Sequence, residues 1–150
     1  MDVSFKEFAD QSPCLCFQLR KASRAITQVY DQMLRTTGLT ACQMMILNVL
    51  SQIGALTVTA LAEAMATDRT TITRNLQPLQ RKGWVKLQKG KDRRSRLVGL
   101  TAAGSKAVRR TEPIFRDFQK KLHAHLSEAR LQTLCQELAQ TISTIQQFSL

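Results

Sequence analysis

Apolar residues recur along most of the chain at the spacing of amphipathic helices, and residues able to cap a helix come before several of these segments. The first predicted helix covers residues 14–36. Its apolar positions form a heptad stripe of Leu15, Leu19, Ala22, Ile26, Val29 and Met33. A stripe so narrow and regular predicts that this helix packs against another long helix.

Two shorter helices follow. Thr40 and Gln43 fit a capping box for a helix over residues 41–52, which Gly54 ends. Thr57 is placed to cap a short third helix. The side chains that we expect in the core from these two helices are Ile46, Leu47, Val49, Leu50, Ile53, Val58, Leu61, Ala62 and Met65.

A fourth helix is predicted over residues 69–82, after a cap at Thr67-Asp68. Its apolar positions are only three, Ile72, Leu76 and Leu79. Nearly all its other side chains are polar or basic. Because proline removes a helical hydrogen bond, Pro78 predicts either a kink or an earlier end.

Beyond Gly83 the apolar period changes to two. Trp84 to Gln88 and Arg96 to Leu100 are predicted strands, joined by a basic turn from Lys89 to Ser95. These residues form a hairpin, called the wing below, with a cationic tip.

Two long helices complete the chain. Thr101 caps a fifth helix running to about His125, bent near Pro113. Its expected buried residues are Ala103, Ala107, Ile114, Phe115, Phe118 and Leu122. A sixth helix starts at Ser127. Its apolar stripe consists of Leu131, Leu134, Cys135, Leu138, Ile142 and Ile145.

Length and composition place this chain among single globular domains. It has 150 residues, and its longest apolar run, Met44 to Leu47, is far shorter than a membrane span. The first fifteen residues lack the basic start and apolar block of a secretory signal, so we expect a cytoplasmic protein. Its four cysteines are too few for a disulfide framework and are expected to be thiols.

The basic charge is concentrated in one third of the chain. The net charge is +11, and residues 57–100 hold ten basic and three acidic side chains. This concentration predicts one surface for a polyanion, with nucleic acid favoured over an anionic membrane. The ten basic residues are Arg69, Arg74, Arg81, Lys82, Lys86, Lys89, Lys91, Arg93, Arg94 and Arg96.

A short helix, a turn, a polar helix with few core positions and a basic hairpin are together typical of a winged helix-turn-helix. The polar helix fits the major groove of double-stranded DNA, and long cations at the hairpin tip fit the minor groove. The candidate contacts on the helix are Arg69, Thr70, Thr71, Thr73, Arg74, Asn75 and Gln77. On the wing they are Lys91, Asp92, Arg93, Arg94 and Arg96.

The order of residues in this region is similar to that of a known family. The stretches Leu61 to Leu76, Leu79 to Val85 and Asp92 to Gly104 resemble the MarR family of bacterial transcription regulators. The likeness covers residues 14–148. It is most specific in the wing and in the Leu-Thr-x-x-Gly that follows the wing.

This resemblance implies a mostly α-helical winged helix-turn-helix fold with a small β-hairpin. Residues 14–37 and 102–148 would supply dimerisation helices, and residues 40–100 the DNA-binding lobe. It also implies a homodimer on a pseudo-palindromic operator, in which Asp92 braces Arg94 in the minor groove. Such regulators mostly repress, and a small aromatic or phenolic effector or an oxidation event releases them.

The cysteine near the start of the first helix is a candidate sensor of oxidation. The segment around Cys16 and Tyr30 is similar to the branch of the family that senses organic hydroperoxides, in which a Cys at the place of Cys16 is oxidised near a Tyr at the place of Tyr30. A helix start favours a reactive thiolate. That branch also has a Tyr at about position 41, where this chain has Ala41.

Other functions are less well supported. His123 and His125 lie two residues apart on a helix and point about 200° away from each other, so they cannot bind one metal ion together. The chain has no Gly-rich phosphate loop or nucleophile elbow, which argues against an enzyme, and no cofactor is expected. The alternative that stays open is a nonspecific architectural DNA-binding protein.

Overall fold

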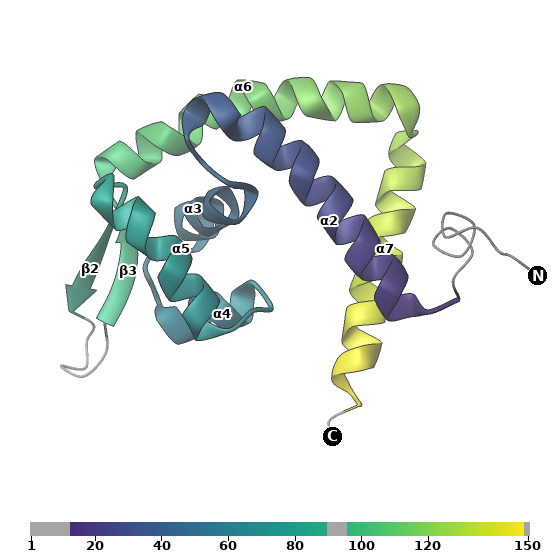
Figure 1. Cartoon of the computed structure of the whole chain (residues 1–150), viewed down its shortest axis with the longest axis horizontal. Coiled ribbons are helices and arrows are strands. Elements are labelled where there is room, and N and C mark those ends of the chain that lie inside the picture. The colour runs from purple at the N-terminus through teal and green to yellow at the C-terminus, as the bar shows by residue number, and fades with distance from the viewer. Residues whose placement is uncertain (1–12, 90–95, 149–150) are drawn as a thin grey trace, which may run out of the picture. The chain divides into compact units, whose positions relative to one another are not determined.

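The structure is a computed structural model that describes residues 13–89 and 96–148 (Figure 1). Its helices and strands, in chain order, are α2 (Leu15–Leu34), η1 (Arg35–Thr37), α3 (Ala41–Ile53), β1 (Leu56–Thr57), α4 (Val58–Ala64), α5 (Arg69–Arg81), β2 (Val85–Lys89), β3 (Arg96–Leu100), α6 (Ala102–His125) and α7 (Glu128–Gln146). This mostly helical fold with a small wing confirms the fold class predicted from the sequence. None of the helices within the described ranges is long and apolar enough to cross a bilayer.

The predicted helix caps are present. Thr40 and Gln43 form the capping box of α3, and the Thr57 hydroxyl accepts a hydrogen bond from the N–H of Ala60. Gly38 ends the turn after α2 with a φ of 69°, a left-handed conformation that glycine adopts without strain. Local side chains therefore account for most of the helix boundaries.

The chain divides into two compact units, Met1–Thr111 and Glu112–Leu150. In the first unit, α3, α4 and α5 pack with the small sheet around one apolar core (Figure 1). Its fully buried side chains include Leu34, Met44, Ile46, Leu47, Leu61, Ile72, Leu79 and Val98. The three apolar positions of α5 are all buried, so the rest of that helix is available for another role.

The sheet is antiparallel with strand order β1-β3-β2. Val85 pairs with Leu100 and Lys89 with Arg96, which forms the predicted hairpin. Strand β2 begins one residue later than expected, because the N–H and carbonyl of Trp84 bond Leu79 and Thr101 outside the ladder. The short strand β1, on the other edge of β3, was not predicted.

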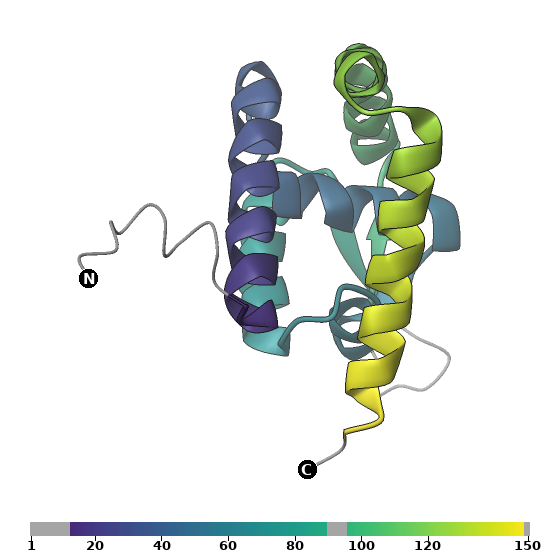
Figure 2. The same cartoon turned by 90° about the vertical axis from the view of Figure 1, so that its right-hand side faces the viewer.

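The second unit holds the end of α6 and all of α7. These helices meet at a corner, since Figure 2 shows α6 nearly end-on while α7 runs down the picture. The predicted stripe on α7 has no buried member, and Leu134, Leu138, Ile142 and Ile145 are all exposed. An apolar stripe of this length normally lies against a partner.

Two predictions about the core are wrong. Ile53 is 63 % exposed, because it is the last residue of α3 and the chain turns away at Gly54. Ala103 is exposed, whereas Gly104 is the residue of that turn that packs against the lobe. Both prolines are accommodated, since α5 continues past Pro78 and α6 past Pro113.

Candidate nucleic-acid interface

Helix α5 begins at a doubly bonded cap. The Oδ1 of Asp68 accepts the backbone N–H of Thr71 at 2.7 Å, and its Oδ2 accepts the Thr71 hydroxyl at 2.7 Å. These two hydrogen bonds hold the pKa of the Asp68 carboxyl below its usual value, and the bond from the backbone N–H has the larger effect. The cap fixes the start of the helix immediately before its polar face.

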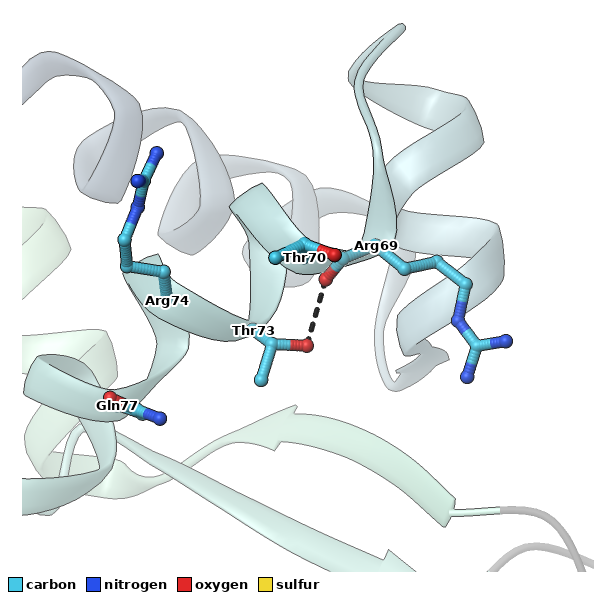
Figure 3. A pocket seen from close by; sticks show the side chains of 5 residues that line it. All are labelled: Arg69, Thr70, Thr73, Arg74 and Gln77. Atoms are coloured by element: carbon cyan, nitrogen blue, oxygen red, sulfur yellow. Dashed lines mark hydrogen bonds between the residues drawn. The ribbon is translucent and has the colours of Figure 1, made fainter.

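Five of the seven predicted contacts on α5 lie on one exposed surface (Figure 3). They line an open depression of about 570 Å³. These residues, called the α5 face below, are Arg69, Thr70, Thr73, Arg74 and Gln77. None of these five residues is acidic, so their formal charge is positive.

The other two predicted contacts are engaged within the helix. The Thr71 hydroxyl bonds the Asp68 carboxylate, and the Asn75 amide donates to the Thr71 carbonyl at 2.9 Å. Both side chains are half-buried. Burial separates Thr71 and Asn75 from the α5 face, because the exposed Thr73 hydroxyl also donates to a carbonyl of the helix, that of Arg69, at 2.8 Å.

The two arginines of the α5 face extend in opposite directions (Figure 3). Arg74 acts on the half-buried thiol of Cys42, on α3. Burial raises the pKa of that thiol, the Asp31 carboxylate raises it further, and Arg74 opposes the increase. Asp31 also accepts the N–H of Ala41 at 2.6 Å. The hydrogen bond between Asp31 and Ala41 was not predicted, because it joins two helices across a turn and leaves no local sequence signal.

The wing is described at its base and not at its tip. Arg96 opens β3 and is exposed. The other predicted wing contacts, Lys91, Asp92, Arg93 and Arg94, lie outside the described residues.

The base of the wing is fastened to the start of α6. The Thr101 hydroxyl donates to the Gly83 carbonyl at 2.7 Å and accepts the Gly104 N–H at 3.0 Å. A Cβ atom on Gly104 would lie only 2.0 Å from the Trp84 carbonyl oxygen, so no larger residue fits there without a shift. These contacts give the Leu-Thr-x-x-Gly segment a structural role.

The predicted sensor residues lie on α2. Cys16 is exposed in the first turn, whereas Tyr30 is half-buried and burial raises its pKa. Fourteen residues of helix separate them by about 21 Å within one chain, so they are not neighbours there. Cys14 and Cys135 are exposed as well. In the part of the chain that the structure describes, no three His, Cys, Asp or Glu side chains gather as a metal site would require.

Comparison with known proteins identifies the family. The family model for MarR matches residues 39–95. The chain is 29% identical over 110 residues to the HTH-type transcriptional regulator YwoH of Bacillus subtilis, covering 73% of this chain and 80% of YwoH. The crystal structure of the M. tuberculosis transcriptional regulator MosR in complex with DNA matches with 34% identity, a TM-score of 0.74, and coverage of 88% of this chain and 98% of MosR.

The chain belongs to the MarR family. The S. aureus MepR–DNA complex is also similar, with 25% identity, a TM-score of 0.74, and coverage of 90% of this chain and 99% of MepR. This MarR protein is thus a DNA-binding transcriptional regulator with a winged helix fold, and not an enzyme.

Proposed function

We propose that the protein is a cytoplasmic, homodimeric repressor that binds a pseudo-palindromic operator and releases it on a chemical signal. The α5 face carries this proposal, because it presents two arginines and three uncharged polar side chains with no acid among them. Each subunit would place this face in the major groove of one half-site.

The chemistry of the α5 face suits DNA. Arginine can bond the two acceptors of a guanine edge or a phosphate, and threonine can contact phosphates or a thymine methyl group. The wing would add contacts in the adjacent minor groove from Lys91, Arg93, Arg94 and Arg96, with Asp92 bracing Arg94. The crystal structure of the similar MosR in complex with DNA supports DNA as the partner.

Exposed apolar stripes support the homodimer. On α2, Leu15, Ile26 and Val29 are 53, 42 and 40 % exposed. The α7 stripe is exposed over its length. In a dimer, the helices within residues 14–37 and 102–148 of the two chains would cover these stripes.

Two signals for release stay in consideration. Cys16 is exposed at the start of α2, where an oxidant can reach it, while burial and Asp31 make the Cys42 thiol harder to ionise. A small aromatic or phenolic effector is the other signal. An open depression of about 350 Å³ lies along α2, lined by Phe17, Arg20, Lys21, Arg24, Ala25 and Gln28, and its cations and ring suit an aromatic acid.

A selection from random duplexes separates this proposal from a nonspecific architectural protein. We expect an enriched palindrome for the wild-type protein, and then a loss of roughly 1–3 kcal/mol in binding free energy for Arg74→Ala and for Arg94→Ala. Gel-shift titration measures both losses, and sedimentation checks that the dimer persists. An absence of any enriched site would favour the architectural protein, and unchanged affinity in both variants would refute the proposed contacts.

The oxidation signal is tested with cumene hydroperoxide. If Cys16 is the sensor, the peroxide releases operator DNA from the wild-type protein and not from Cys16→Ser, as measured by fluorescence anisotropy. The matched control is Cys14→Ser, because Cys14 is another exposed thiol, two residues from Cys16 and outside the apolar stripes. Release from all three proteins would end the Cys16 proposal and leave the small-molecule effector.

A further inference from the structure

One basic residue of the DNA-binding lobe has its charged group bound to other residues of the lobe. Lys82 is the C-cap of α5 and stands among the ten basic residues of this region. Its Nζ donates to the carbonyl of Gly38 and lies 4.6 Å from the centre of the Trp84 ring. An ammonium held between a carbonyl oxygen and the face of an indole ring is engaged on two sides.

These contacts join two distant parts of the lobe. Gly38 lies in the turn between α2 and α3, and Lys82 lies in the connection between α5 and β2. A Cβ atom on Gly38 would come within 3.1 Å of the Lys82 Nζ, so glycine leaves the space that the ammonium occupies. The lysine side chain is therefore a bridge between the turn that joins α2 to α3 and the end of α5.

The same connection is bonded from its other side. The Gly83 carbonyl accepts the Thr101 hydroxyl, and the Trp84 carbonyl accepts the Thr101 N–H at 3.1 Å. Residues 82–84 thus receive contacts from the turn between α2 and α3 and from the start of α6. Since β2 begins at Val85, the orientation of this connection sets the direction in which the wing leaves α5.

We propose that Lys82 is a positioning residue for DNA binding. By bridging Gly38 and Trp84, it keeps the wing correctly oriented relative to α5, and it does not contact a phosphate. The inference rests on the proposed function, because it requires α5 and the wing to occupy adjacent grooves. Removing a lysine that neutralises a phosphate lowers both the affinity for DNA and the salt dependence of that affinity. Removing a lysine that only orients the wing lowers the affinity and leaves its salt dependence unchanged.

The test uses the duplex selected by the wild-type protein and measures its dissociation constant by anisotropy from 50 to 300 mM KCl. Lys82→Met keeps the length of the side chain and removes the ammonium. We expect a loss of about five- to tenfold in affinity at every salt concentration, since one cation–ring contact and one hydrogen bond are lost. The slope of the logarithm of the association constant against the logarithm of the salt concentration stays that of wild type. Losing one phosphate contact would instead make this negative slope shallower by about 0.9.

Two further variants serve as controls. Lys86→Met removes one positive charge from an exposed position on β2 and shows what the loss of that charge does by itself. Lys82→Arg retains a cation and a donor and is expected to recover most of the affinity. Circular dichroism identifies a temperature at which every variant is folded, and all titrations are made there.

Footprinting distinguishes a misplaced wing from a general loss of stability, because a general loss would reduce protection in both grooves equally. With Lys82→Met, we expect hydroxyl-radical protection of the minor groove beside each half-site to weaken, while protection of guanine N7 in the major groove persists. A shallower salt slope, wild-type affinity in Lys82→Met, or equal loss of both protections would each overturn the inference. Failure of the wild-type protein to select any site would instead refute the proposed function.

Discussion

Asp68 shows how much of the lobe depends on a single side chain. Its carboxylate accepts both the backbone N–H and the hydroxyl of Thr71, and so starts α5 and turns Thr71 away from the α5 face. The sequence predicted the cap from residue type and position. It could not predict that Thr71 would be engaged there, because a threonine in the first turn can equally well point outward.

The cap gives stability a pH dependence. Because the Asp68 carboxyl has a lowered pKa in the folded state, its contribution is complete above the ordinary value of 3.8 and is lost as the pH falls through the lowered value. We expect Asp68→Asn, which keeps an acceptor and cannot ionise, to melt below the wild-type protein at pH 7. The two melting temperatures should converge as the pH falls below 3.8, as measured by circular dichroism. A difference that is constant across the pH range would contradict this account.

At the scale of elements, the sequence predicted what apolar periodicity and capping residues determine, and it missed features that show no such pattern. The spacing of Ile72, Leu76 and Leu79 gave the buried side of α5 correctly, because only a helix places those three positions together. Strand β1 has only two residues, too few for any alternation to reveal. Asn75 was predicted to contact DNA; its side chain is half-buried and its amide donates to the Thr71 carbonyl, a bond that the sequence did not predict.

The two sides of α5 should respond differently to mutation. Thr73 lies on the α5 face, so Thr73→Ala is expected to weaken operator binding by about 1 kcal/mol. Asn75→Ala, the matched control on the same helix, is expected to leave affinity within about 0.5 kcal/mol of wild type, since the Asn75 side chain is half-buried whereas that of Thr73 is exposed. Gel-shift titration measures both values. The reverse order of effects would show that Asn75, and not Thr73, faces DNA.

For the molecule as a whole, the periodic apolar stripes were the most informative part of the sequence, and their members on α7 are not buried in the residues that the structure describes. The stripe on α7 predicted burial, and the described chain leaves every member of it at least partly exposed. An exposed apolar stripe of this length is typical of a helix that packs against a partner. Periodicity shows that a residue needs a partner, and does not show which chain supplies it.

Disrupting the α7 stripe should therefore separate the subunits. Leu138 lies within the stripe, and we expect Leu138→Asp to be a monomer in analytical ultracentrifugation, because a charge would be buried at the interface. Its affinity for the full palindrome should fall to that for a single half-site. Gln140→Asp adds the same charge on the opposite side of α7 and should remain dimeric. A dimeric Leu138→Asp protein would place the interface elsewhere.

The small number of core residues on α5 also bears on how such a regulator changes over generations. Three of its thirteen residues are buried, and they lie on one side of the helix. Substitutions on the opposite side alter which bases are contacted and leave the packing that folds the lobe untouched. After gene duplication, a copy of this protein could thus acquire a new operator through a few changes to the α5 face, without first losing and regaining its fold.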